Sequence, residues 1–262
     1  MKVPKKPNLK TVLICTLVAE MINPLFAQGL IVIQHAGATD PLTEGFVGTS
    51  SGGHPVINDM GVNAWATPDN ATNGWSTVFS DYTYILTSQQ LTEAVGAGWI
   101  FSANLRIATT NGGNATFCAA LNLGSEGYFR LYFGSTITGD PFVEAVNYGP
   151  GSPTNIIAQV TLTGAGSTYN NYQLVYDASA RTASLWINGS KYVKSIALGQ
   201  PNYGGAVYWG CLGAQEGYAQ ANWNSVSLEI VPEPSSLSLL FLGGGLLLYD
   251  RRNRKILIKT SI

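Results

Sequence analysis

The sequence predicts an all-β protein whose body is an antiparallel two-sheet sandwich. Short runs rich in β-branched and aromatic residues recur between residues 30 and 230, and turn-forming residues separate nearly every pair of runs. Charged residues are few in this region, whereas Gly, Asn, Ser and Thr are abundant, as is common in secreted β proteins. About two hundred residues suit a single domain of this kind, and the sequence contains no internal repeat.

The expected strands follow one another closely along the chain. The first covers residues 30–35, and a polar, Gly-rich stretch at residues 36–61 follows it without a regular pattern. Further strands are expected at residues 82–87, 99–107, 116–123, 128–133, 142–148, 156–162, 172–176, 182–187, 192–197, 206–211 and 223–230.

Two local signals specify particular elements. Asn188-Gly189 lies between two apolar runs, and this dipeptide tolerates positive φ at both turn positions, which predicts a β-hairpin. Residues 88–95 form the one expected helix, because Ser88 can cap its N-terminus and an apolar face follows.

Residues 1–27 have the order of parts found in a secretory signal peptide. Four lysines precede an apolar run at residues 12–19, and the segment ends in Ala27, a small residue suited to cleavage before Gln28. We therefore expect export through the Sec translocon, which leaves residues 28–230 as the folded body.

The C-terminal residues form a second expected membrane signal. Its parts, in order, are the motif Pro232, Glu233 and Pro234, an apolar helix at residues 237–249, a basic cluster at residues 251–255 that includes Arg251 and Arg252, and a tail at residues 256–262. The prolines keep the motif extended, and the arginines would hold the chain end in the cytoplasm. The apolar run is shorter than the roughly twenty residues of a full span, so a buried helix is the alternative, which three consecutive glycines disfavour.

Residues 231–255 resemble the PEP-CTERM sorting domain of Gram-negative bacteria in their Pro-Glu-Pro motif, short apolar segment and basic end. The resemblance implies that an exosortase, a membrane-embedded cysteine protease or transpeptidase, recognises the chain in the inner membrane. The protein would then reach the cell surface or the extracellular matrix. Carriers of this signal are often associated with exopolysaccharide production, so an exopolysaccharide is an expected partner.

Residues 172–189 run from a strand through a loop and a second strand to the Asn-Gly turn, and they resemble the laminin-G-like form of the concanavalin A-like lectin/glucanase sandwich. Residues 220–230 fit the last strand of that family. The resemblance implies a jelly-roll sandwich across residues 30–230. The fold occurs in sugar binders, glycosidases and interaction modules, so it does not decide the function.

The charge of the exported body restricts its partners. Residues 28–230 contain five basic and twelve acidic side chains, a net charge of −7, whereas the whole chain carries −1. An acidic surface repels phosphate backbones, so we expect no nucleic-acid partner.

Two cysteines remain after signal cleavage, Cys118 and Cys211. The exported compartment permits a disulfide between them. The alternative is a pair of separate buried thiols, because both cysteines lie in apolar runs and a free cysteine packs as a small hydrophobic residue.

The sequence contains no clear catalytic motif. Glucanases of the resembled fold carry a Glu-x-Asp-x-Glu or Glu-x-Asp-x-x-Glu strand, which this chain lacks, and its carboxylates are scattered. Neither His35 nor His54 lies in a nucleophile-elbow context, and no zinc-ligand spacing occurs. We therefore expect a non-catalytic protein, with a secreted glycosidase as the alternative because distant carboxylates can still converge.

Calcium is the one expected cofactor candidate. Asp69 and Asn73 place oxygen ligands close together in an expected loop, and Asp177 begins another. The alternative for each is a turn in which the side chain bonds to its own backbone.

Three aromatic residues are candidates for stacking on sugar rings. Trp186 alternates with an aliphatic set in its strand, so it points outward if that set faces the core. Trp75 lies in an Asn- and Gly-rich loop, and Tyr208 lies on the opposite side of its strand from Trp209. Burial in the core is the alternative for each. The sequence thus favours an exported, glycan-associated module, with a structural or adhesive surface protein as the second hypothesis.

Overall fold

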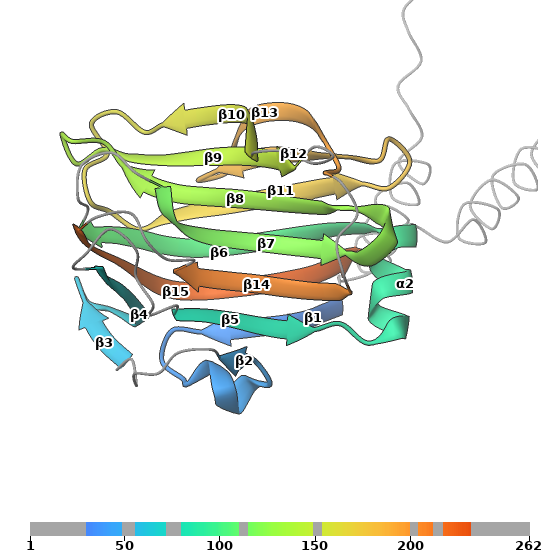
Figure 1. Ribbon diagram of the computed structural model, residues 1–262, viewed down its shortest axis with the longest axis horizontal. Coiled ribbons are helices and arrows are strands. Elements are labelled where there is room, and N and C mark those ends of the chain that lie inside the picture. The colour runs from blue at the N-terminus through green and yellow to red at the C-terminus, as the bar shows by residue number, and fades with distance from the viewer. Residues whose placement is uncertain are drawn as a thin grey trace, which may run out of the picture. The chain divides into compact units, whose positions relative to one another are not determined.

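Two antiparallel β-sheets stack on one another in the computed structural model, as the sequence predicts (Figure 1). The structure describes residues 30–48, 56–71, 80–109, 115–148, 154–199, 204–211 and 217–231. The expected signal peptide and the expected sorting signal with its apolar helix lie outside these residues. Within the described part of the chain, no helix has the length and apolar composition needed to cross a membrane.

The first sheet has eight strands. Seven are hydrogen-bonded in the order β13 (Ser190–Ala197), β12 (Thr182–Ile187), β11 (Asn170–Asp177), β6 (Gly98–Thr109), β15 (Gly217–Val231), β4 (Val62–Ala71) and β3 (Val56–Asp59), and β1 (Leu30–Ala36) also pairs with β15. We call it sheet A. The first and last strands of the described chain, β1 and β15, therefore lie side by side.

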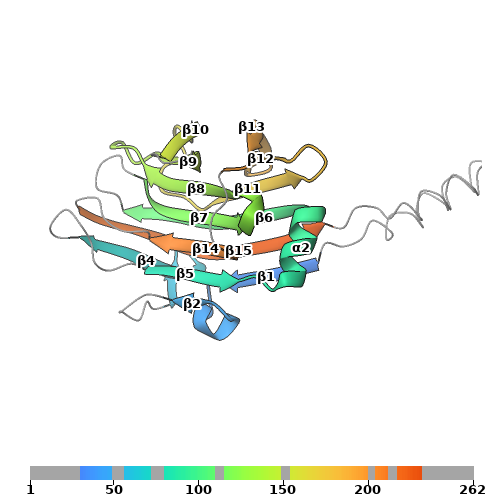
Figure 2. The ribbon, with the colours of Figure 1, turned by 45° about the vertical axis from the view of Figure 1, so that its right-hand side comes forward.

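The second sheet, sheet B, has seven strands. Their order is β10 (Thr154–Thr161), β9 (Pro141–Tyr148), β8 (Tyr128–Ser135), β7 (Ala115–Leu123), β14 (Gly205–Cys211), β5 (Ser80–Ile85) and β2 (Val47–Gly48). The strands β7 to β10 form a meander, in which each strand pairs with the next along the chain. β10 and β13 lie at one edge of the sandwich, and β2 and β3 lie at the other (Figures 1 and 2).

Strand alternation builds the core between the sheets. Phe129, Leu131 and Phe133 of β8 face inward and are almost completely buried. Trp209 of β14 stacks on Tyr82 at 4.7 Å between ring centroids and lies 5.2 Å from Trp223 of β15. Large aromatic residues from both sheets therefore interlock at the centre of the core, where they supply much of the buried apolar area.

β15 is shared by two partners on one side. β4 pairs with its first half and β1 with its second half, and the chain passes between them at Gly37. The Gly37 amide donates to the Asn224 carbonyl at 2.7 Å, and a β-carbon at Gly37 would lie 2.6 Å from the Trp223 carbonyl oxygen. Only glycine fits this close approach of backbones.

The expected helix is confirmed as α2 (Ser88–Gly96), and it lies at one end of the sandwich (Figure 2). Its N-cap is Thr87 rather than Ser88, because the Thr87 hydroxyl accepts from the Gln90 amide while the Gln90 side chain accepts from the Thr87 amide. This reciprocal capping box requires a hydroxyl residue three positions before a glutamine. Two 3-10 helices, η2 (Pro41–Glu44) and η3 (Gly124–Glu126), are the other helical turns of the described chain.

The stretch at residues 36–61, which showed no regular pattern in the sequence, contains the strands β2 and β3, and β4 follows it where no strand was expected. β3 and β4 pair with each other. They form a hairpin whose turn residues, Met60 and Gly61, both have positive φ. The one hairpin that the sequence predicted is confirmed, since Asn188 and Gly189 have φ of 49° and 78° between β12 and β13. Met60 is an unusual residue in such a turn, which is why the sequence did not indicate it.

Cys118 and Cys211 do not form a disulfide in the structure, and both are buried as thiols. The two residues lie on the neighbouring strands β7 and β14, one register position apart. Cys211 faces the core beside Trp209, whereas Cys118 lies between the inward-facing Phe117 and Ala119 and so points to the other side of the sheet. A bridge cannot cross a sheet from one face to the other.

Candidate functional site

The outer face of sheet B collects aromatic and charged side chains. Along β8, Tyr128, Arg130 and Tyr132 point outward, because the residues between them face the core. The Arg130 guanidinium lies 5.5 Å from the centroid of the Tyr128 ring and 5.6 Å from that of Tyr132. Its Nη1 atom also donates to the Tyr132 hydroxyl at 2.9 Å. The two rings thus fix an arginine between them on this face.

The strand register brings Tyr208 close to this arginine. Ala120 of β7 lies opposite Arg130 on one side and opposite Tyr208 of β14 on the other. One pair further along, Cys118 lies between Tyr132 and Gly210. The small residues between the large ones leave the rings of Tyr132 and Tyr208 standing above the sheet, both partly exposed.

Two carboxyl groups lie on the same outer face of sheet B, one on each side of the tyrosines and Arg130. Asp81 of β5 pairs with Gly210, and its Oδ1 atom is buried without a hydrogen-bond partner in the described part of the chain. Glu144 of β9 pairs with Tyr132 and accepts a 3.1 Å hydrogen bond from Gln159. Burial raises the pKa of both carboxyl groups. Each therefore holds a proton to higher pH than an ordinary surface carboxylate does.

The distance between these carboxyl groups limits their chemistry. Asp81, Gly210, Cys118, Tyr132 and Glu144 follow one another across five adjacent strands. Four steps of about 4.8 Å place the backbones of Asp81 and Glu144 about 19 Å apart. Glycosidases that use two carboxylates hold them roughly 5–10 Å apart, so these two groups do not form such a pair.

Trp186 lies on the outer face of sheet A, as the alternation of its strand predicts. Its aliphatic neighbours Ala183, Leu185 and Ile187 are buried in the core. The Lys191 ammonium lies 4.8 Å from the centroid of the Trp186 ring, from the next strand β13. One face of this ring is therefore covered by a cation, and Trp186 is less available for sugar stacking than the sequence indicated.

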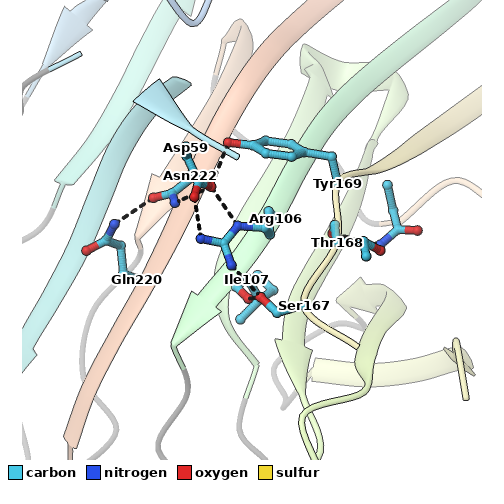
Figure 3. Close-up of polar contacts among 9 residues, drawn as sticks. Asp59, Arg106, Ile107, Ser167, Thr168, Tyr169, Gln220 and Asn222 are labelled. Atoms are coloured by element: carbon cyan, nitrogen blue, oxygen red, sulfur yellow. Dashed lines mark hydrogen bonds and ion pairs between the residues drawn. The ribbon is translucent and has the colours of Figure 1, made fainter. Parts of the chain in front are cut away.

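A second polar cluster lies on the outer face of sheet A around Asp59, at the turn end of the β3–β4 hairpin (Figure 3). The Asp59 carboxylate accepts two 2.6 Å hydrogen bonds from Arg106 of β6. It also accepts from the Tyr169 hydroxyl at 2.9 Å and from the Asn222 amide of β15 at 2.8 Å. Four donors from three separate segments thus converge on one carboxylate.

The remaining contacts of this cluster are also internal. Arg106 donates to the Ser167 hydroxyl at 2.8 Å, and Ser167 in turn donates to the Ile107 carbonyl at 2.5 Å (Figure 3). Burial acts to raise the pKa of Asp59, but the hydrogen bonds of Arg106, Asn222 and Tyr169 and the charge of Arg106 hold it below its usual value. We conclude that the cluster fastens the β3–β4 hairpin to the sheet, because its bonding capacity is spent within the fold.

The structure describes only part of the expected calcium-binding residues. Asp69 lies in strand β4 opposite Ala219 rather than in a loop, and Asn73 lies outside the described residues. Asp177 accepts from the Ser179 hydroxyl and the Ala180 amide, which lowers its pKa and makes the alternative of a backbone turn correct. Nowhere in the described ranges do three or more His, Cys, Asp or Glu side chains meet in a way that could hold a metal ion.

Sequence reasoning located part of the candidate site. Tyr208 is placed outward as expected, while Trp75 and the sorting residues Pro232, Glu233, Pro234, Arg251 and Arg252 lie outside the described chain. Tyr128, Arg130 and Tyr132 were missed as site residues. Their signal was present in the alternation of Tyr-Phe-Arg-Leu-Tyr-Phe, which places the polar members on one side of a strand.

No protein-family model matches the chain, and a search of curated proteins finds no match. Solved structures do match. A conserved carbohydrate esterase from the Shiga toxin-encoding bacteriophage phi24B aligns with a TM-score of 0.60 and 10% identity, over 78% of this chain and 99% of that one. The CBM2 module of the evolved Dit of Lactobacillus casei BL23 phage J-1 aligns with a TM-score of 0.50 and 13% identity, over 78% and 96%. The Crh5 transglycosylase in complex with NAG aligns with a TM-score of 0.50 and 11% identity, over 79% and 87%. At these identities the likeness shows a shared fold alone.

Proposed function

We propose that the protein is an exported, non-catalytic glycan-binding module that holds its ligand on the outer face of sheet B. The observation that carries this proposal is the row of Tyr128, Arg130 and Tyr132, with Tyr208 beside it on the same face. The rings of Tyr132 and Tyr208 are partly exposed and can stack on the C–H faces of sugar rings. Tyr128 is only 5% exposed and packs against Arg130, whose guanidinium can donate to sugar hydroxyl groups.

The charges of the face and of the body restrict the glycan. Asp81 and Glu144 flank the aromatic group and can accept hydrogen bonds from sugar hydroxyls. The net charge of −7 on residues 28–230 opposes the approach of a polyanion. A neutral polysaccharide, such as a neutral exopolysaccharide of the producing cell, fits this combination best.

The similar structures support the proposal to a limited degree. The three compared proteins are described as a carbohydrate esterase, a CBM2 module and a transglycosylase in complex with NAG. Similar β-sandwich folds therefore occur in several proteins whose descriptions relate to carbohydrates. The residues that would bind the glycan here are argued from this chain alone.

Glycan binding by the purified protein, measured on an array and by affinity electrophoresis with the producer's polysaccharide, tests the proposal. Tyr132→Ala and Tyr208→Ala should each weaken binding by about tenfold, as expected when a buried ring contact worth more than 1 kcal/mol is removed. Adding calcium or a chelator should leave the affinity unchanged if the face needs no metal.

Trp186→Ala is the matched variant, because it removes an outward aromatic ring from the other sheet. It should keep binding within about twofold and keep the thermal midpoint. Loss of binding in Trp186→Ala with unchanged binding in the two tyrosine variants would place the ligand on sheet A and contradict the proposal. Absence of binding to any glycan would favour a structural or adhesive protein.

The route of export is part of the same proposal. The signal at residues 1–27 and the resemblance of residues 231–255 to a PEP-CTERM domain support translocation, membrane anchoring and exosortase recognition. A reporter fused within the exported body should be active only outside the cytoplasm. Replacing Pro232, Glu233 and Pro234 with alanine should leave the protein in the inner membrane fraction, and an unchanged final location would refute the sorting signal.

A glycoside hydrolase is the second candidate function, favoured by the raised pKa values of Asp81 and Glu144. A carboxyl group whose pKa is raised is better suited to serve as a general acid than an ordinary surface carboxylate. Incubation with the bound polysaccharide should release no reducing ends over many hours. Release that disappears in Asp81→Asn or Glu144→Gln would establish catalysis and replace the binding role.

A further inference from the structure

β10 of sheet B and β13 of sheet A lie near each other at one edge of the sandwich (Figures 1 and 2). A groove lies at this edge, lined by residues from the end of β10 to β13. Its volume is about 420 Å³, within the range of roughly 300–1,000 Å³ that is usual for small-molecule sites. The walls include Thr161 and Thr163 at the end of β10, Asn170 at the start of β11, Asn188 in the hairpin turn and Tyr192 of β13. This edge is separate from the outward-facing row on β8.

Tyr192 reaches the groove through an irregularity in β13. Trp186 pairs with Lys191 and Leu185 pairs with Val193, so Tyr192 is an extra residue with no partner across the hairpin. Such a bulge turns a side chain out of the regular alternation of the strand. The Tyr192 side chain is 51% exposed, which leaves a large part of it open to a ligand.

The wall opposite the solvent is held rigidly. The Asn188 side chain donates to the Asn170 amide oxygen at 2.8 Å and accepts from the Asn171 backbone amide at 2.9 Å. Asn170, only 3% exposed, donates to the Thr168 carbonyl at 3.1 Å. Across the groove, Asp140 accepts from the Gly164 amide at 2.9 Å and so fixes the loop after β10. A ligand would meet walls that need no further ordering.

The lining has the chemistry of a site for a neutral, hydroxyl-rich ligand. None of the lining residues carries a charge. Within the described chain, the hydroxyl groups of Thr161, Thr163 and Tyr192 make no hydrogen bond, so they remain able to donate and accept. An aromatic ring beside amides and free hydroxyl groups suits a pyranose, which presents C–H groups on its faces and hydroxyl groups at its rim.

We propose that this groove is a second saccharide subsite, in which the ring of Tyr192 stacks on one sugar residue of a neutral glycan. The inference rests on the proposed function, because it extends glycan binding from the face of sheet B to a separate edge. Two sites on one module would let it bind two segments of polysaccharide at once, which raises the effective affinity for a branched or networked polymer.

Backbone and side-chain NMR shifts of the labelled full-length protein, titrated with laminarihexaose and with cellohexaose, test the subsite. We expect saturable shifts at Tyr192, Asn188 and Gly164 with at least one of these neutral hexasaccharides. Tyr192→Ala should raise the dissociation constant measured from these shifts at least fivefold. Tyr192→Phe should change it by no more than about twofold, because the ring is kept.

Lys194→Ala is the matched control, because Lys194 is an exposed residue of the same strand and does not line the groove. It should leave the groove shifts unchanged, and the thermal midpoints of the variants should agree.

The same titration separates the two proposals. Shifts in the groove together with shifts at Tyr132 and Tyr208 support both sites. Shifts in the groove alone support the subsite and refute the proposed binding face. Saturable shifts on the face with none in the groove overturn the subsite. Absence of groove shifts with both hexasaccharides also overturns it, as does equal weakening in Tyr192→Ala and Lys194→Ala.

Discussion

His35 is a polar residue enclosed by aromatic rings. Its imidazole is fully buried, stacks on Trp209 at 4.5 Å and meets Phe46 and Trp65 edge-on. The Nδ1 atom lies 2.6 Å from Glu44, a distance that fits a neutral imidazole donating to a carboxylate. Glu44 also accepts from the Ala36 amide and the Thr39 hydroxyl. The imidazole therefore links β1 to the η2 turn through a single buried hydrogen bond.

We predict that this histidine destabilises the fold as the solution becomes acidic. Burial lowers the pKa of His35 by more than the hydrogen bond and charge of Glu44 and the charge of Asp40 raise it. The unfolded chain, with a pKa near about 6.5, therefore binds the proton more tightly than the folded one. The stabilisation is complete above about pH 6.5 and is lost as the pH falls through the lowered pKa, with a slope of at most about 1.4 kcal/mol per pH unit.

Urea unfolding of the native protein and of His35→Gln, between about pH 8 and pH 5, measures this effect. Glutamine cannot titrate, and its amide can still donate to Glu44. The variant should lose less stability across this interval. Asp81 and Glu144 titrate in both proteins, so the difference between the two curves isolates His35. Identical slopes would contradict the prediction.

Gly37 gives a second prediction at the scale of one residue. A β-carbon there would lie within 2.8 Å of three backbone atoms, in Trp223, Asn63 and Ala64, none of which can rotate away. Gly37→Ala should therefore destabilise the protein by about 1–3 kcal/mol, measured by thermal or urea unfolding. Gly96→Ala is the control, because nothing lies within 4 Å of its added carbon, and it should be neutral or slightly stabilising. Equal effects at both positions would refute the steric argument.

At the scale of elements, the β3–β4 hairpin depends on one ion pair. Arg106 and Asp59 have side chains only 15% and 12% exposed, so solvent screens their attraction weakly. Arg106→Ala leaves a largely buried carboxylate with two neutral donors and should cost about 2–3 kcal/mol in unfolding free energy. A double-mutant cycle with Asp59→Ala should give a coupling energy well above zero.

Arg181→Ala is the matched control for this pair. Arg181 also forms a 2.6 Å ion pair, with Glu126, but its side chain is 64% exposed. Its removal should change stability by no more than about 0.5 kcal/mol, as is usual for exposed pairs. A loss at Arg106 no larger than the loss at Arg181 would show that the hairpin does not depend on the network.

The elements that the sequence predicted well are those whose own residues decide their structure. β12 is alternating, and the Asn188-Gly189 turn requires positive φ, so both follow from local chemistry. β4 was missed because it contains Pro68, Asp69 and Asn70, which are unfavourable in strands. Pairing with β15 over seven register positions overrides these preferences. Such tertiary compensation cannot be seen in a short window of sequence.

At the scale of the whole molecule, no disulfide among the described residues links the strands, because Cys118 and Cys211, both in sheet B, remain thiols. Burial raises the pKa of the Cys118 thiol to about 12, and Cys211 lies in the core. In a Cys15→Ser chain, reductant should therefore move the thermal midpoint by less than about 1 °C, whereas loss of a disulfide worth roughly 2–4 kcal/mol would move it by several degrees. Neither thiol should react with a thiol reagent before unfolding, and rapid reaction of the native protein would contradict the buried positions.

The candidate binding face is a property of the assembled sheet. Strand alternation alone places Tyr208 and Tyr132 outward. It cannot show that Asp81 and Glu144, which are far apart in the chain, occupy one row with Tyr132, next to the row that contains Tyr208. That row depends on β14 lying between β5 and β7, a pairing of strands distant in sequence. The outward direction of each side chain could be predicted from the sequence, but not that these side chains lie together on one face of the sheet.

The edge strands of the two sheets also affect whether copies of the protein aggregate at high concentration. β2 has two residues and β3 has four, while β10 and β13 are interrupted by bulges, and β13 carries Lys191 and Lys194. Each edge strand is therefore too short or too irregular to pair along its backbone with a strand of a second molecule. Such edges disfavour edge-to-edge pairing between copies, so we expect the protein to resist amyloid-like aggregation at high concentration.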